Sequence, residues 1–469
     1  MDAVKAAADE PDIRYHPQRR FLKRGMIMGR DTLTLSFVEK LWNTPFSRAS
    51  MEKAKYGLMD YIASSYAGKD DTGVAKLVRM ARLEGGHPLA PVLFHSMDVS
   101  PSQSALINGF MGHALDYDDV HSQVRGHPST VILPALLAVC DAGTTGRRFL
   151  EAYIIGVEAM ARIAQALTNE HYERGFHNTG TTGVLAATLA GAYLKTYSVE
   201  KACLALGFAT TQASGLRVHF GTETKPLHAG LAASSAVRAL LLADADVQAN
   251  KASLDGEIGF FAVFGQGIER ARELLLQESG PAWRIETPGL WFKLYPFCSG
   301  AYYGVHAAEK IGPIPLERIA GIEIIFPHRS DAALVHRNPS NGEEGRFSIE
   351  YITALILSGR GLRPDDFQRV PIGEEIRAYM EKMKRINVFD VPAVRRYTQI
   401  TVKLTDGNTI SETGDCPKGS PGNPVTEQEL ISKFAGIVKS EHASVVLDRI
   451  LKLDETENVQ AFAKQLGEL

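Results

Sequence analysis

The chain has 469 residues, of which 45% are hydrophobic and 22% are charged, and its formal net charge is -3. This length exceeds what one hydrophobic core usually serves, so we expect two or three globular domains. The balanced charge, without a long run of Lys and Arg, excludes a phosphate-tracking surface and predicts neither a nucleic-acid nor a membrane partner. The longest apolar segments, such as residues 183–194, are too short to span a bilayer.

Residues 1–30 are polar and irregular, which predicts a mobile extension. Acidic side chains such as Asp9 and Glu10 are atypical of a mitochondrial presequence, so we expect a cytoplasmic location. The four cysteines are scattered and form no Cys-x-x-Cys pair, which favours a reducing compartment over a disulfide scaffold.

The stretch from residue 31 to 287 has mostly helical periodicity. Small residues are dense within it, for example in 186–192 and 232–236, and small residues allow helices to approach closely. The pattern therefore predicts a compact bundle with buried helices at 149–167, 181–197, 201–213 and 228–245.

The pattern changes near Trp291. Residues 319–326 and 397–404 are rich in β-branched side chains and predict strands, and Asp406-Gly407 predicts a hairpin turn after the second one. Helical stretches are expected at 347–357 and 373–386. Residues 288–424 therefore read as an α+β domain, after which Thr426, with Glu429 placed for a capping box, opens the C-terminal helices of 425–469.

One short segment, residues 108–129, carries a dense group of titratable side chains. It contains three aspartates and three histidines: Asp116, Asp118, Asp119, His113, His121 and His127. The apolar run 131–139 follows at once, so these groups must lie against buried structure. Such a setting shifts pKa values and is typical of acid–base chemistry.

Three further segments carry polar groups. In 175–183, glycines open a helix whose free N–H groups favour a carboxylate, and His177 stands beside them. In 221–230, Lys225 lies at the entrance of a helix and would anchor an acidic substrate. The segment 292–298 lies at the predicted domain junction, where clefts usually form, and we expect its Cys298 to be a packing residue.

Motifs for nucleotides, for dinucleotides, for His-Glu-x-x-His zinc sites and for Gly-x-Ser-x-Gly nucleophiles are absent from the sequence. We therefore expect no cofactor and no metal. Two alternatives stay open. One is a metal-dependent hydrolase with Asp116, Asp118, His121 and His127 as ligands, and the other is a helical scaffold without enzymatic activity.

Taken together, these segments resemble the MmgE/PrpD family, which includes 2-methylcitrate dehydratases, cis-aconitate decarboxylases and iminodisuccinate epimerases. The matching stretches are 108–134, 175–183, 221–230, 293–296, 347–355 and 417–424. The resemblance implies a mainly α fold in which 31–287 and 425–469 form one all-helical domain and 288–424 form an inserted α+β lid. It also implies an active site in the cleft between the two, a homodimer, and many members without a metal.

The resemblance implies catalytic roles for Asp116, His127, His177 and Lys225, and substrate-binding roles for Lys293, His228 and Tyr295. His127 is the first candidate for moving a proton, with Asp116 as its partner or as the base itself. Two positions depart from the decarboxylase branch, because Val120 replaces a threonine and Cys298 replaces a histidine.

The expected function is a cofactor-independent lyase that acts at a carbon next to a carboxylate of a small di- or tricarboxylate. A 2-methylcitrate- or citrate-type dehydratase is the first reading. A cis-aconitate-type decarboxylase and an iminodisuccinate-type epimerase are the alternatives, because the same residues could serve all three reactions.

Overall fold

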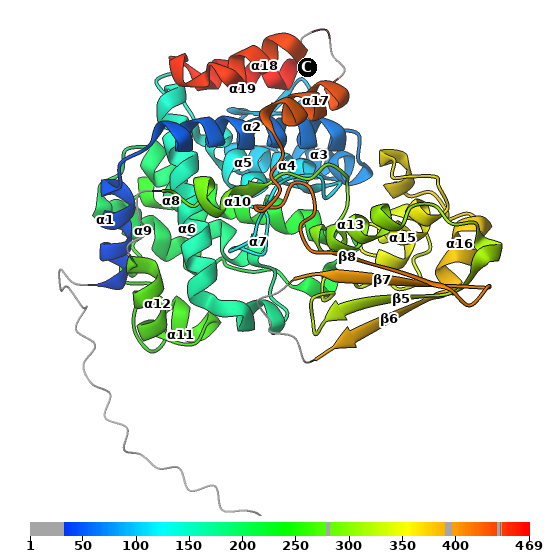
Figure 1. Ribbon diagram of the computed structural model, residues 1–469. Coiled ribbons are helices and arrows are strands. Elements are labelled where there is room, and N and C mark those ends of the chain that lie inside the picture. Colours follow the sequence, from blue (N-terminus) through cyan, green and yellow to red (C-terminus); the bar gives the residue numbers. More distant parts are fainter. Residues whose placement is uncertain (1–31, 278–281, 390–395, 439–440, 442) are drawn as a thin grey trace, which may run out of the picture.

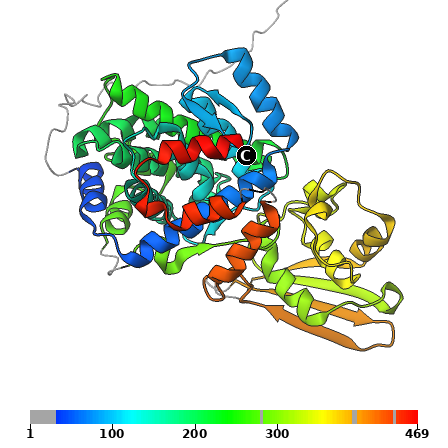
Figure 2. The same ribbon diagram turned by 90° about the horizontal axis from the view of Figure 1, so that it is seen from above.

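The computed structural model describes residues 32–277, 282–389, 396–438, 441 and 443–469. The predicted extension over 1–30 lies outside the described residues. The described chain forms a large helical body and a smaller α+β lobe beside it (Figures 1 and 2). The fold is mainly α, as the sequence predicts.

The helical body is built from the N-terminal and C-terminal parts of the chain. Its helices are α1 (Leu33–Asn43), α2 (Arg48–Gly68), α3 (Thr72–Glu84), α4 (Pro101–His113), α5 (Ser129–Val139), α6 (Gly146–Glu173), α7 (Asn178–Thr181), α8 (Gly183–Leu194), α9 (Val199–Thr210), α10 (Thr224–Asp244), α11 (Phe260–Phe264), α12 (Ile268–Leu276), α17 (Glu427–Ile437), α18 (Ala443–Leu451) and α19 (Val459–Glu468). A two-stranded ribbon of β1 (Ala90–Val92) and β2 (Met97–Val99) lies among them.

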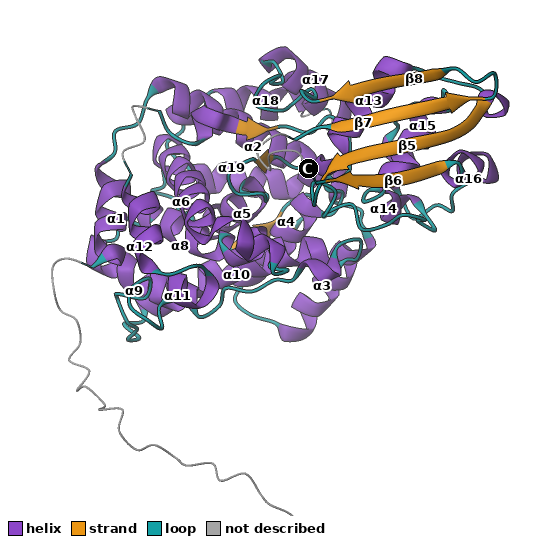
Figure 3. Cartoon of the chain, turned by 60° about the horizontal axis from the view of Figure 1, so that its bottom comes forward, coloured by secondary structure: helices purple, strands orange, loops and turns teal. Residues whose placement is uncertain are grey.

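The α+β lobe holds a four-stranded sheet in the order β6-β5-β7-β8. Its strands are β5 (Ile319–Pro327), β6 (Met383–Val388), β7 (Thr398–Leu404) and β8 (Thr409–Gly414), and its helices are α13 (Tyr302–Ile311), α14 (Gly342–Gly345), α15 (Ile349–Leu357) and α16 (Glu374–Glu381). Figure 3 shows the sheet with one face open and the helices behind the other. The hairpin predicted at Asp406-Gly407 joins β7 to β8, which confirms that turn.

One predicted helix of this lobe is partly wrong. The helical pattern expected over 373–386 ends at Glu381, and Met383–Val388 forms the edge strand β6, parallel to β5. The sheet overrides local propensity here, because Arg385 turns inward and forms ion pairs with Glu350 and Asp331.

Two glycines allow α4 and α10 to cross closely. A side chain at Gly109 would lie 2.8 Å from the Gly230 Cα atom, and one at Gly230 would lie 2.2 Å from the Leu106 carbonyl oxygen. His113 follows Gly109 by one turn, and Lys225 precedes Gly230 by about the same length. The crossing therefore brings His113 and Lys225 together on one side of it.

A second contact links the body to the lobe. Strand β3 (Val120–His121) pairs antiparallel with β4 (Leu290–Trp291), so that Val120 faces Trp291 and His121 faces Leu290. Lys293 follows β4 by two residues. The pairing thus holds Lys293 next to the segment that contains Asp116 and Asp118.

The described residues form two hydrophobic cores. The first draws on residues from Leu33 to Phe292 and again from Leu430 to Leu466. The second combines Val120 with residues from Trp291 to Leu404. The exact domain boundaries given above stay a prediction. Among the described helices, α10 alone is long and apolar enough to cross a membrane, and 67% of its apolar window is buried inside the protein, as is usual for a core helix.

Candidate active site

The site begins at a tight turn after α4. Asp116 has a φ of +52°, in the left-handed region that aspartate adopts more readily than most residues, and its N–H donates to the His113 carbonyl oxygen at 3.1 Å. The turn directs the carboxylate inward, where Asp116 is buried.

Asp116 holds two buried lysines through one carboxylate oxygen. Lys293 Nζ lies 2.6 Å and Lys225 Nζ 3.1 Å from Asp116 Oδ1, and Lys293 also donates to the Asp116 carbonyl oxygen at 2.7 Å. Burial raises the pKa of the Asp116 carboxyl, but the two ammonium groups lower that pKa more, to well below its usual value. Asp116 is therefore ionised and paired.

The two lysines differ in acidity. Burial lowers the pKa of Lys225, and the attraction of Asp116 only partly offsets this. Burial acts on Lys293 too, but its closer contacts with Asp116 raise its pKa above the usual value. Lys225 is thus the more acidic of the two ammonium groups.

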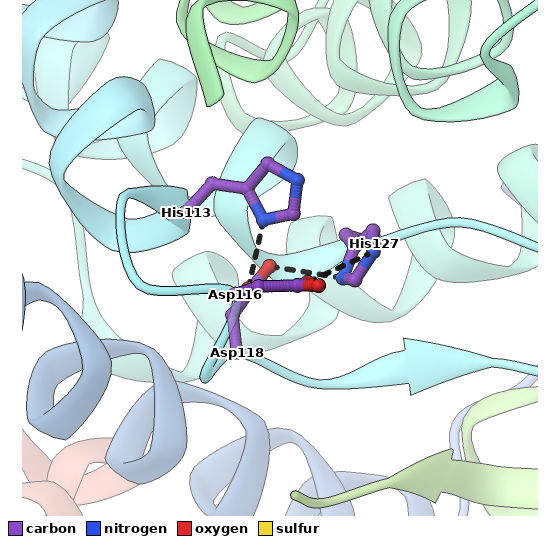
Figure 4. A group of neighbouring side chains, drawn as sticks. All are labelled: His113, Asp116, Asp118 and His127. Atoms are coloured by element: carbon purple, nitrogen blue, oxygen red, sulfur yellow. Dashed lines mark hydrogen bonds and ion pairs between the residues drawn. The ribbon is translucent and has the colours of Figure 1, made fainter. Parts of the chain in front are cut away.

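His113 connects Lys225 to Asp118. Its Nε2 lies 2.9 Å from Lys225 Nζ and its Nδ1 lies 2.8 Å from Asp118 Oδ1. An ammonium group can only donate, so Nε2 accepts and Nδ1–H donates to Asp118. Burial lowers the pKa of His113 to about 3, which keeps the ring neutral. Figure 4 shows His113, Asp116, Asp118 and His127 converging on one point.

His127 lies on the other side of Asp116. Its Nδ1 is 2.9 Å from the Asp119 carbonyl oxygen and 3.2 Å from Asp118 Oδ2, while its Nε2 is 3.6 Å from Asp116 Oδ1. A carbonyl oxygen can only accept, so Nδ1 carries the proton in the neutral ring and Nε2 is free to receive one. Burial lowers the pKa of His127, so the neutral form prevails at neutral pH.

His177 and His228 form a separate pair. Their Nδ1 atoms are 3.1 Å apart, so one ring donates and the other accepts. Burial lowers the pKa of both rings, that of His228 to about 4. The centroid of the His177 ring lies 6.4 Å from that of His113, so the pair flanks the Asp116 centre without bonding to it.

A small cleft between the body and the lobe reaches this centre. His113, Asp116 and Lys225 line it, and Asp71, Glu343 and Arg346 also line it. Of the residues predicted from the sequence, Asp116 and Lys225 thus reach the cleft, and His127 and Lys293 contact Asp116.

Tyr295 lies apart from this group. Its backbone N–H and carbonyl both bond to the Tyr302 hydroxyl, and its ring stacks on Phe297. Asp119 and His121 have structural partners: Asp119 accepts from the Ser129 hydroxyl, and His121 Nε2 donates to the Arg284 carbonyl oxygen. Cys298 is buried in the second core, in agreement with its expected packing role.

The residues of the proposed metal alternative are only partly brought together. Ligand atoms of His113, Asp116, Asp118 and His127 lie within 4.8 Å of one another, whereas His121 is not in this group. Two ammonium groups already hold Asp116 Oδ1, and a metal ion there would meet their charge directly. The donor set therefore suits lysine cations better than a metal.

Two residues of the site escaped the sequence reasoning. His113 was counted in the segment but received no role, although it bonds to both Lys225 and Asp118. Arg346 stands immediately before the matching stretch 347–355, and an isolated arginine in a loop carries no signal of its own.

The fold and the site define an enzyme with a helical body, an α+β lobe and a buried acid–base centre at their junction. The MmgE/PrpD N-terminal domain matches residues 34–272 and the MmgE/PrpD C-terminal domain matches residues 295–455. The chain belongs to the MmgE/PrpD family.

Similar proteins include two cis-aconitate decarboxylases. The human protein is 26% identical over 387 residues, which covers 79% of this chain and 77% of the human one. The Aspergillus terreus protein is 25% identical over 462 residues, which covers 89% of this chain and 91% of the fungal one. These names support an enzyme that acts on tricarboxylates.

Proposed function

We propose that the protein is a lyase that acts at a carbon next to a carboxylate of a small tricarboxylate, and that decarboxylation of cis-aconitate is the first reaction to test. The observation that carries this proposal is the buried centre in which Asp116 pairs with Lys225 and with Lys293, and of which Asp116 and Lys225 line the cleft. The names of the similar proteins favour decarboxylation among the family reactions.

The electrostatics of the centre fit this chemistry. Loss of CO2 or of a proton leaves a carbanion conjugated with a carboxylate, so negative charge grows as the transition state forms. Lys225 and Lys293 are fixed by Asp116 before substrate arrives, and fixed cations in a buried site stabilise developing charge without reorganising.

Proton transfer falls to two groups. In decarboxylation the C–C bond breaks, CO2 leaves, and the carbanion takes a proton from an acid. Lys225 is suited to supply it, because it lines the cleft and burial lowers its pKa. His127 Nε2 is suited to accept a proton, as dehydration would require.

Dehydration of a 2-methylcitrate- or citrate-type acid is the second candidate. Val120 and Cys298 stand where the decarboxylase branch has a threonine and a histidine, and both are buried apolar contacts of the second core here. These two replacements favour a reaction that differs from that branch.

We also propose that the protein is a homodimer. Three leucines are exposed on α10: Leu231, Leu241 and Leu242. Large apolar side chains exposed along one helix favour a partner surface. Light scattering after gel filtration should give twice the chain mass, and a monomer at micromolar concentration would contradict this.

The test is incubation of the purified protein with cis-aconitate, citrate, 2-methylcitrate and iminodisuccinate in D2O, followed by proton NMR. We expect cis-aconitate to lose CO2 and to yield an unsaturated five-carbon dicarboxylate that carries deuterium. Water loss from citrate or 2-methylcitrate alone would instead support the second candidate. Deuterium exchange confined to iminodisuccinate would indicate an epimerase, and no change in any acid would overturn the proposal.

A further inference from the structure

Three arginines are buried in the described part of the chain, and they differ in their partners. Arg162 pairs with Glu158 at 2.6 Å, and Arg385 pairs with Glu350 at 2.6 Å. Arg346 has no described carboxylate within salt-bridge distance. Burying a guanidinium without a direct ion pair is unfavourable, so Arg346 is suited to bind an anion.

The protein contacts of Arg346 are carbonyl oxygens. Its Nε donates to the Phe367 carbonyl at 2.8 Å, within the α+β lobe, and its Nη1 donates to the Ala114 carbonyl at 2.7 Å, just beyond α4 of the body. A guanidinium has five N–H donors, so these two bonds leave three for another acceptor.

Arg346 also lines the cleft that leads to Asp116 and Lys225. The acidic residues nearest to it in the cleft have other partners. Glu343 pairs with Arg369 at 2.6 Å, and Asp71 accepts the Gly73 N–H at 2.8 Å as the N-cap of α3. The remaining donors of Arg346 are thus available to a bound molecule.

We propose that Arg346 binds one carboxylate of the substrate from the side of the α+β lobe. This inference rests on the proposed function, because the ligand is the same small tricarboxylate. Lys225 and Lys293 form ion pairs with Asp116, whereas Arg346 forms none with a described carboxylate, and its planar fork suits a carboxylate. Arg346 is therefore a specificity residue that separates tricarboxylates from dicarboxylates.

The test measures binding and needs no turnover. Tricarballylate, a saturated tricarboxylate, is titrated calorimetrically into the full chain. Glutarate and methylsuccinate are titrated in the same way, because each corresponds to tricarballylate with one carboxylate removed. Arg346→Gln should weaken tricarballylate roughly 10- to 100-fold, as expected for a lost charge-assisted hydrogen bond. Arg346 holds one carboxylate of tricarballylate, and one of the two dicarboxylates lacks that carboxylate. This dicarboxylate should bind the wild type and Arg346→Gln with equal affinity.

Arg377→Gln is the matched control. Arg377 also lies in the α+β lobe and donates to two carbonyl oxygens, those of Ile372 and Ser340, but it does not line the cleft. Its replacement should leave tricarballylate binding within twofold of the wild type. Arg346→Lys keeps the charge without the planar fork, so it should bind tricarballylate several-fold more weakly than the wild type does. This variant provides the test if Arg346→Gln does not fold.

The outcomes separate the two proposals. Equal tricarballylate affinity in the wild type and in a folded Arg346 variant overturns the role of Arg346 and leaves the proposed function standing. An equal loss for all three acids also overturns it, since it indicates a general disturbance of the cleft. If the wild type binds no tricarballylate, the proposed function itself fails.

Discussion

At the scale of single residues, one carboxylate oxygen holds both lysines of the site. Asp116 Oδ1 receives both buried ammonium groups, and Asp116 Oδ2 is buried without a hydrogen-bond partner. A carboxylate whose pKa is held so low is a poor base. We therefore favour Asp116 as the anchor of Lys225 and Lys293, and His127 as the group that accepts a proton.

The role of His127 leads to a direct prediction. His127→Ala should lower kcat by at least about 100-fold, the usual contribution of a general acid or base, while the far-UV circular dichroism stays unchanged. The measurement is water loss from citrate or 2-methylcitrate, because dehydration is the reaction that needs a proton acceptor. His328→Ala, on an exposed histidine of the α+β lobe, should retain full activity. Near-wild-type activity of the His127 variant would exclude this role.

Much of this site could be predicted from the sequence, because its acids and histidines are concentrated in residues 108–129. Lys225 and Lys293 are far away in the sequence; the pattern suggested Lys225 as a charge anchor, whereas only the resemblance assigned Lys293. What unites them is tertiary: the Gly109–Gly230 crossing and the β3–β4 pairing. No local pattern reports that Arg346 lacks a carboxylate partner, so it could not be found in this way.

At the scale of elements, Lys433 joins α17 to α2 by a buried ion pair and to the site segment by a hydrogen bond. Lys433 Nζ lies 2.7 Å from Asp60 Oδ1 on α2 and 3.0 Å from the Tyr117 carbonyl oxygen, one residue after Asp116. Asp60 Oδ2 has no hydrogen-bond partner. Removing the lysine would leave a buried carboxylate without its counter-charge.

Lys433→Met should therefore lower the free energy of unfolding by about 3–5 kcal/mol, as is typical when one member of a buried ion pair is removed. Urea denaturation measures the loss. The double variant Asp60→Leu/Lys433→Met should recover part of it, since no isolated charge remains. Lys452→Met, which breaks an exposed ion pair with Asp448, should leave the urea concentration at the midpoint of unfolding unchanged. Equal midpoints for Lys433→Met and the wild type would contradict this view of α17.

The elements themselves were predicted unevenly. The strands β5 and β7, the hairpin turn and the Thr426–Glu429 capping box are confirmed, because β-branched alternation and cap residues act locally. Strand β6 was mistaken for helix, because its place is set by its partner β5 and by the buried contacts of Arg385. Long-range pairing leaves little trace in a single short segment.

At the scale of the whole molecule, the buried histidines make stability depend on pH. Burial lowers the pKa of His113 to about 3 and that of His121 and His228 to about 4, from about 6.5 in the unfolded chain. Between these values the unfolded state binds more protons than the folded state, so the free energy of unfolding falls as the pH falls.

We expect each such histidine to cost roughly 2 kcal/mol when the pH is lowered from 7 to 5. Denaturant unfolding at several pH values measures the slope. His121→Asn removes one of the buried groups away from the cleft, so its slope should be shallower than that of the wild type. Parallel slopes would mean that His121 does not titrate in this way.

The split of the first core across the chain has a consequence for biosynthesis. Leu430, Phe434 and Leu466 belong to the core that begins at Leu33, whereas all but one residue of the second core fall between Trp291 and Leu404. During translation the α+β lobe is therefore complete while the body still lacks its last helices. The nascent body exposes apolar surface until α17, α18 and α19 emerge, so this is the period in which a chaperone protects it best.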